Sequence, residues 1–286
     1  MRTGTGKAGV LYVVATPLGN LADITYRAVQ VLKDVDLIAA EDTRHSRPLL
    51  THYGIETRTI SLHEHNEQAR ARTLTARLLA GESIALISDA GTPVISDPGY
   101  RLIAGVRDAG VRVSPVPGPS ALIAALSAAG LPTDRFVFEG FLPAKAGARR
   151  RRLEGLATET RTLVIYESSH RIEASVADMR DAFGPERRAV IARELTKAFE
   201  TLHDDALEAL CQWLADDSNH RRGEFVVIVA GATELEEGDA AEVRRVLSLL
   251  LRELSPKIAV RLAAQLTGES RNRVYEMALA LSRNDK

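Results

Sequence analysis

Runs of β-branched and apolar residues alternate with segments of helical spacing along most of the chain. Strand, helix and strand in this order predict βαβ units and a mostly parallel sheet. In the first half, the expected strands span residues 11–16, 36–40, 59–62, 84–88 and 111–116, and the expected helices span residues 25–35, 66–80 and 100–109.

A second set of strands and helices follows a turn at residues 117–120, which contains two prolines and a glycine. Its expected strands span residues 136–142, 162–168, 189–195, 199–203 and 224–231. We therefore predict an α/β protein with two α/β domains, residues 10–118 and 119–233, that both have mostly parallel sheets. Residues 234–286 are expected to form a linker and a small C-terminal helical module.

The last segment of the chain has the signals of a linker followed by short helices. Residues 233–242 carry five acidic residues and no basic one, which is typical of a solvated linker. Ser255 before Pro256 is a good helix cap and first turn, Gly268 is expected to end that helix, and a second helix spans about residues 271–281. This pattern fits a helix-turn-helix-like module and a helical hairpin packed on the core equally well.

Charge and cysteine content exclude several classes of function. The formal net charge is −1, so nucleic acid could be bound through local basic patches but not through the overall field. The single cysteine, Cys211, excludes an intramolecular disulfide and a multi-cysteine metal site. No apolar run approaches the roughly 18–20 residues of a membrane span. Residues 1–9 contain no apolar stretch, so we expect no signal peptide. We expect a cytoplasmic protein that does not bind membranes.

Three motifs that could indicate chemistry have simpler explanations. Residues 4–9 match the dinucleotide motif G-x-G-x-x-G but precede the first expected strand instead of following one. His63 and His65 would share a face of a strand, but no third ligand stands at a familiar spacing, so no metal site is expected. The nucleophile motif G-x-S-x-G is absent, and Ser120 is better explained as a helix cap.

Loops rich in glycine and proline follow three strands of the first domain, at residues 16–20, 89–99 and 117–120. In an open parallel sheet, ligands bind beyond the carboxyl ends of the strands. Glycine allows close approach to the backbone and proline fixes its direction, so these loops would present carbonyl and amide groups at fixed positions. These loops are better explained as the site of a ligand that is bound mainly by backbone groups, such as S-adenosylmethionine, than as three unrelated tight turns.

Longer motifs around these loops resemble the tetrapyrrole-methylase superfamily, and within it the branch that methylates small-subunit ribosomal RNA. They lie at residues 16–25, 39–46, 86–103, 117–132, 138–143 and 166–172. The resemblance implies a class III methyltransferase-like fold, a homodimer, and S-adenosylmethionine bound between the two domains. It also implies 2′-O-methylation of a cytidine in the decoding region of 16S rRNA, with the assembled small subunit as the expected partner.

Methyl transfer from a sulfonium is an in-line displacement, which requires no metal. The same resemblance assigns the residues that contact the cofactor, by motif match. The implied contacts are Pro17, Leu18, Gly19, Asp89, Ala90, Gly91, Thr92, Pro93, Ser120, Ala121 and Tyr166.

Two polar motifs offer groups that could act on a ribose hydroxyl, which is a poor nucleophile and must be positioned or deprotonated. The first follows the second strand and offers Asp42 and Arg44; the second follows a strand of the second domain and offers Glu167 and His170. Alternatively, Asp42 and Arg44 cap the next helix and pair with each other, and His170 caps a helix or binds phosphate.

RNA contacts are expected from a basic stretch, predicted to be a loop, that has five cations and no acid between residues 143 and 152. These cations are Lys145, Arg149, Arg150, Arg151 and Arg152. Two other functions stay open: methylation of a small tetrapyrrole, and an RNA-binding assembly factor without methyl transfer. The basic stretch and the helical module favour RNA over a tetrapyrrole, since a small tetrapyrrole needs neither.

Overall fold

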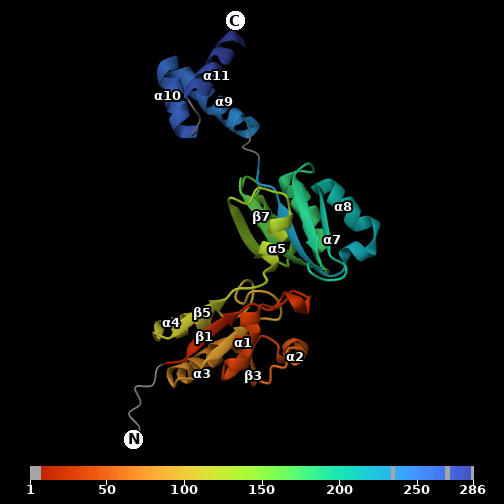
Figure 1. The fold of residues 1–286 in the computed structure, drawn as a ribbon. Coiled ribbons are helices and arrows are strands. Elements are labelled where there is room, and N and C mark those ends of the chain that lie inside the picture. Colours follow the sequence, from red (N-terminus) through yellow and green to blue (C-terminus); the bar gives the residue numbers. More distant parts are fainter. Residues whose placement is uncertain (1–7, 233–235, 268–270, 285–286) are drawn as a thin grey trace. The chain divides into compact units, whose positions relative to one another are not determined.

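The computed structural model describes residues 8–232, 236–267 and 271–284 and divides the chain into two compact units (Figure 1). The first unit is Met1–Gly231 and the second is Ala232–Lys286. The first unit contains two five-stranded sheets, one built from strands up to residue 116 and one from strands after residue 135.

The first sheet is fully parallel, as the sequence predicts. Its strands follow the order β3-β2-β4-β1-β5. Their bounds are β1 Val10–Val14, β2 Leu37–Ala40, β3 Thr59–Ser61, β4 Ile84–Ile87 and β5 Arg112–Val116. Because the strands are parallel, the loops after β1, β2, β4 and β5 emerge at the same edge of the sheet.

Helices cover both faces of the first sheet, which explains why its central strands β2 and β4 are apolar and buried on both sides. Leu32 of α1 (Tyr26–Asp34) and Leu50 of α2 (Thr43–His52) pack on one face. Leu74 of α3 (Glu67–Leu79) and Val106 of α4 (Tyr100–Asp108) pack on the other. A short 3-10 turn, η1 (Leu21–Asp23), precedes α1.

The second sheet is mostly antiparallel, so the prediction of a mostly parallel sheet is wrong for this domain. Its order is β6-β7-β10-β8-β9, and only the β6–β7 pair is parallel. β10 lies between β7 and β8 and runs opposite to both, and the segment between β8 and β9 is too short for a crossover helix. The bounds are β6 Phe136–Phe141, β7 Thr162–Ser168, β8 Arg188–Arg193, β9 Thr201–Ala206 and β10 Glu224–Val229.

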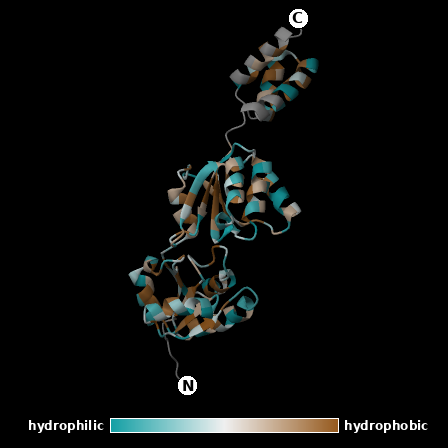
Figure 2. Ribbon diagram, turned by 90° about the vertical axis from the view of Figure 1, so that its right-hand side faces the viewer, coloured by the Kyte–Doolittle hydropathy of each residue, from teal (hydrophilic) through white to brown (hydrophobic). Residues whose placement is uncertain are grey.

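Helices also cover both faces of the second sheet. The helices α6 (Ala146–Glu154), α7 (Ile172–Phe183) and α8 (Leu207–Asp216) pack on one face, and α5 (Ala121–Ala128) packs on the other. A 3-10 turn, η2 (Ser218–Arg221), precedes β10. Figure 2 shows apolar residues concentrated on the strands of this domain and hydrophilic residues on its outer helices.

Two segments predicted as loop or linker are helical. The basic stretch forms α6, because arginine favours helices and Leu153 packs into the core beside the buried stem of Arg149. Most of the acidic segment is the start of α9 (Glu236–Glu253), where acidic residues favour a helix N-terminus. Residues 233–235 of that segment lie outside the described residues.

The second unit has three helices around an apolar core of its own. They are α9, α10 (Pro256–Thr267) and α11 (Arg271–Asn284), and Val243, Ala259 and Val274 are fully buried among them. The carbonyl of Ser255 accepts hydrogen bonds from the amides of Ile258 and Ala259, so α10 begins where the sequence predicts. Gly268, expected to end this helix, lies outside the described residues. Among the described helices of the chain, none has the length and apolarity to cross a membrane.

Candidate active site

A cavity of about 450 Å³ lies at the carboxyl edge of the first sheet and extends to the second domain. Its volume is in the range of small-molecule sites, about 300–1,000 Å³. The loops after β1, β2, β4 and β5 contribute Leu18, Glu41, residues 89–92 and Ser120. The second domain contributes Tyr166 and other residues of β7, β8 and β10.

Most of the predicted cofactor contacts line this cavity. They are Leu18, Asp89, Ala90, Gly91, Thr92, Ser120, Ala121 and Tyr166. Pro17, Gly19 and Pro93 are neighbours of these residues in the chain but do not line the cavity.

Hydrogen bonds tie the three glycine- and proline-rich loops to one another. The amide of Gly91 donates to the carbonyl of Thr16 at 3.0 Å, and the amide of Thr16 donates to the carbonyl of Gly91 at 2.9 Å. The hydroxyl of Thr92 donates to the carbonyl of Pro119 at 2.9 Å. The cavity wall is therefore fixed before any ligand binds, which lowers the cost of ordering it.

Gly91 is required for this arrangement. Its φ is +78°, a conformation that side-chain-bearing residues rarely adopt. A Cβ at this position would stand 3.2 Å from Cδ2 of Leu18, which lines the cavity. Since the amide and the carbonyl of Gly91 both bond to Thr16, this residue shapes the loop and does not offer its own amide to a ligand.

Tyr166 links the second sheet to the start of α5. Its hydroxyl accepts a hydrogen bond from the amide of Leu122 at 3.0 Å, and the edges of Phe138 and Phe141 pack against its ring. Burial raises the pKa of Tyr166 above its ordinary value, so the phenol is neutral at physiological pH.

Acidic side chains dominate the charge of the cavity. Glu41, Asp89 and Asp97 line it, and no lysine, arginine or histidine of the described chain does. Burial raises the pKa of Glu41. Burial, followed by the charge of Glu41, raises the pKa of Asp97 to about 7. The sequence identified the loop that holds Asp97 but not this side chain, whose environment depends on Glu41 from the loop after β2 and on Asp89 at the start of its own loop. Among the described residues, no group of His, Cys, Asp and Glu side chains could hold a metal ion.

Asp42 and Arg44 adopt the alternative arrangement, in which they cap a helix and pair. Asp42 is the N-cap of α2, and its carboxylate accepts from the amide of Arg44 at 2.8 Å and from the guanidinium at 2.7 Å. Arg44 holds the pKa of Asp42 well below its usual range. Neither residue lines the cavity. This geometry argues against the predicted catalytic role for both.

Glu167 and His170 are also poorly placed for catalysis. Glu167 is among the residues that line the cavity, but its side chain has no exposed surface, and its carboxylate accepts from Ser175 at 2.6 Å and pairs with Arg171 at 2.8 Å. His170 is exposed and does not line the cavity. Glu167 therefore holds the start of α7 against β7, and its predicted role as a proton acceptor is not supported.

The prediction of unopposed cations in the basic stretch is wrong for three of the arginines. Arg149 is buried and pairs with the buried carboxylate of Asp178 at 2.7 Å. Arg150 pairs with the other oxygen of Asp178, and Arg152 pairs with Glu139. Arg149 cannot contact RNA from this position. Lys145 and Arg151 are exposed and form no ion pair with any described residue.

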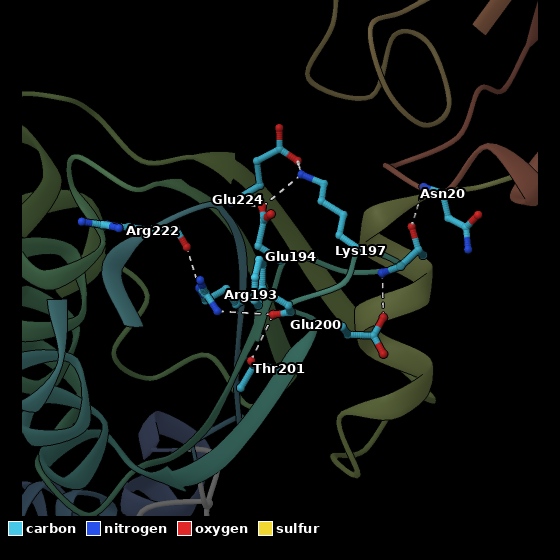
Figure 3. Close-up of polar contacts among 10 residues, drawn as sticks. Asn20, Arg193, Glu194, Lys197, Glu200, Thr201, Arg222 and Glu224 are labelled. Carbon is cyan, nitrogen blue, oxygen red and sulfur yellow. Dashed lines mark hydrogen bonds and ion pairs between the residues drawn. The ribbon is translucent and has the colours of Figure 1, made fainter. Parts of the chain in front are cut away.

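A loop of the second domain contacts the first domain beside the cavity (Figure 3). The ammonium of Lys197 pairs with Glu194 at 3.0 Å and with Glu224 at 2.9 Å. The hydroxyl of Thr196 accepts from the amide of Asn20 at 3.3 Å. A Cβ at Gly19 would overlap the side chain of Lys197, so this glycine leaves room for the contact between the domains.

Comparisons with known proteins agree with this fold. The family model of tetrapyrrole (corrin/porphyrin) methylases matches residues 10–211, and a model of the RsmI C-terminal HTH domain matches residues 237–282. Cobalt precorrin-4 methyltransferase shares the fold at a TM-score of 0.57, with 16% identity over 79% of this chain and 98% of that one. The uroporphyrin-III C-methyl transferase of Thermus thermophilus, solved with S-adenyl homocysteine, has a TM-score of 0.55, with 19% identity over 78% and 97%.

The family match and the fold together identify a two-domain α/β methyltransferase, whose methyl donor is S-adenosylmethionine. The chain belongs to the tetrapyrrole methylase family. A protein of Pseudomonas aeruginosa called ribosomal RNA small subunit methyltransferase I is 59% identical over 95% of this chain and 97% of its own length. A protein of Escherichia coli O157:H7 with the same name is 54% identical over 95% of both chains.

Proposed function

We propose that this protein transfers a methyl group from S-adenosylmethionine to the 2′-hydroxyl of a cytidine in the decoding region of 16S rRNA. The observation that carries the proposal is the similarity, along nearly the whole chain, to proteins named as ribosomal RNA methyltransferases of the small subunit. The match to the C-terminal helical domain supports it further, since that domain lies outside the part shared with the tetrapyrrole enzymes.

The residues of the cavity fit the methyl donor. When bound, the donor supplies an electrophilic methyl group on a sulfonium, which is cationic. Glu41, Asp89 and Asp97 give the cavity a negative charge that favours a cation. The loops around Leu18, Gly91 and Ser120 present backbone groups to an adenosine and an amino acid. We therefore propose that these loops and Tyr166 hold the donor.

The substrate and the assembly are part of the same proposal. We infer that the protein acts in the cytoplasm on ribosomal RNA of the small subunit and forms a homodimer. Large apolar side chains that are exposed in the single chain, such as Phe199 at 73%, support self-association. Light scattering of the purified protein tests this: the mass of one chain would contradict the homodimer.

Two exposed cations of the second domain, Lys145 and Arg151, are expected to contact RNA phosphate. Changing Lys145 and Arg151 together to Ala should weaken binding of small-subunit RNA and flatten the dependence of log K on log salt by up to about 1.4, because each cation on single-stranded RNA contributes about 0.7. The measurement is RNA affinity across a salt series.

A variant with Arg161→Ala and Arg188→Ala is the matched control. It removes the same net charge, but both arginines have carboxylate partners, Glu159 and Asp204. Parallel slopes for the Lys145/Arg151 variant and the wild type would contradict the proposed phosphate contacts.

Methylation of a small tetrapyrrole is the second candidate, because related folds carry out that reaction. The two substrates are separated by a transfer assay with labelled S-adenosylmethionine. We expect label in RNA when small subunits without the modification are supplied, and none in uroporphyrinogen III. Label in the tetrapyrrole and none in RNA would overturn the proposed function.

A further inference from the structure

Asp97 stands apart from the other carboxylates of the cavity. Glu41 and Asp89 accept hydrogen bonds from the backbone amides of Asp89 and Asp42, respectively. The other two carboxylates that line the cavity form ion pairs, Glu167 with Arg171 and Glu224 with Lys197. Of the described carboxylates that line the cavity, Asp97 alone has neither an ion pair nor a hydrogen bond from a backbone amide. Its hydrogen-bond partner is the side chain of Ser88, which leaves further lone pairs of the carboxylate for a substrate.

The loop that carries Asp97 is held in an unusual conformation. Val94 and Ser96 have φ values of 76° and 68°, which are rare for residues with a side chain and especially for a β-branched one. Such conformations persist where the surrounding structure fixes them and are common at functional sites.

Contacts hold this loop. The hydroxyl of Ser96, an exposed residue, lies near Gly140 in the bulge of β6, where a Cβ would stand 3.2 Å from it, so the loop approaches the second domain here. At the other end, the buried carboxylate of Glu67 accepts hydrogen bonds from the amides of Gly99 at 3.1 Å and Arg101 at 2.7 Å. Asp97 is therefore presented to the cavity by a pre-organised segment.

We propose that Asp97 accepts the proton of the ribose 2′-hydroxyl during methyl transfer. The proposal rests on the proposed function. The oxygen–hydrogen bond breaks and its proton passes to a carboxylate oxygen of Asp97. The ribose 2′-oxygen forms a bond to the methyl carbon of the donor. The bond between that carbon and the sulfur breaks, and its electron pair stays on the sulfur, which becomes neutral.

The charges around Asp97 suit this role. Burial and the charges of Glu41 and Asp89 raise its pKa to about 7, while the Ser88 side chain lowers it. Tyr166, on the side of the second domain, is neutral, and His45 acts on Glu41 from α2. A proton acceptor works best when its pKa is near the working pH. A cationic donor favours the ionised carboxylate, and the pKa of Asp97 rises again as that charge disappears, so proton uptake is coupled to transfer.

The test is the pH dependence of methyl transfer in single turnovers, with saturating S-adenosylmethionine and unmodified small subunits. We expect the wild-type rate to rise with pH. Asp97→Asn should lower the rate by about 10²–10⁴-fold and abolish this rise, as loss of general base assistance does. Asp97→Glu should restore part of the rate together with the rise.

Glu41→Gln is a second variant, for which the direction of the change in the pH profile is predicted. It removes a negative neighbour that raises the pKa of Asp97, so the midpoint of the pH profile should move to lower pH. If Asp97 only maintained the fold, the Glu41→Gln substitution would not move this midpoint. An unmoved midpoint, or an Asp97→Asn variant that keeps the rate and the pH profile of the wild type, overturns the proposal.

One further measurement separates this proposal from the proposed function. Nuclease digestion and mass spectrometry of the wild-type product identify the methylated atom. If the wild type places no methyl group on a ribose, the proposed function fails. If it methylates ribose and its pH profile does not depend on Asp97 or Glu41, the role of Asp97 fails while the proposed function stands.

Discussion

Replacing Gly91 with Val should weaken S-adenosylmethionine binding by about 5- to 150-fold. The new side chain enters a backbone with φ of +78°, and its Cβ stands 3.2 Å from Leu18, so the loop or Leu18 must move. Overpacking of this kind costs about 1–3 kcal/mol, which corresponds to that loss of affinity. The double hydrogen bond between Gly91 and Thr16 would be strained as well. Calorimetric titration with S-adenosylmethionine measures the effect.

Gly110→Val is the matched control. Gly110 also has a positive φ, of +72°, but a Cβ there meets no atom within 4 Å. This control shares the backbone strain and lies outside the cavity, so it should lose stability and keep its affinity for the donor. Equal affinities for the Gly91→Val variant and the wild type would contradict the placement of the donor against this loop.

Removing the carboxylate of Asp178 should destabilise the protein by about 3–5 kcal/mol, the usual cost of breaking a buried ion pair. In the Asp178→Ala variant the guanidinium of Arg149, whose side chain is 6% exposed, would be left buried without its partner. Urea unfolding followed by circular dichroism measures the change. Asp181→Ala is the control: Asp181 pairs with Arg180 on the surface of the same helix, and exposed pairs contribute little.

The same ion pair predicts how stability changes with pH. Burial alone would raise the pKa of Asp178, but the hydrogen bonds from Arg150 and Arg149 outweigh it and lower the pKa below its ordinary value. A carboxylate with a lowered pKa in the folded state stabilises the protein above its unfolded pKa, and this contribution is lost as the pH falls through the folded pKa. Wild type and Asp178→Ala should therefore converge in stability in acid. A difference that persists unchanged there would contradict this pairing.

The first sheet and the loops of the cavity could be predicted because their signals are local. The central strands β2 and β4 are buried and apolar throughout, and the loops after β1, β4 and β5 contain glycine and proline directly after the strand. The edge at which these loops meet then follows from the parallel topology alone.

The second sheet and the basic helix could not be predicted because they depend on distant partners. The apolar sequence of β10 does not indicate in which direction the strand runs relative to its neighbours. Its place between β7 and β8 is decided by tertiary packing. The cluster of arginines in α6 suggests a free basic surface until Asp178, 29 residues after Arg149, is placed beside it. Asp97 was missed for the same reason, since Glu41 reaches it from a different strand end.

The most direct test of the proposed function maps 2′-O-methyl groups on 16S rRNA from cells with the gene, without it, and with the Gly91→Val variant in its place. We expect one cytidine of the decoding region to lose its 2′-O-methyl group without the gene. The wild-type gene should restore the group fully, and the variant should restore little of it. An unchanged set of 2′-O-methyl groups in cells without the gene would contradict the proposed function.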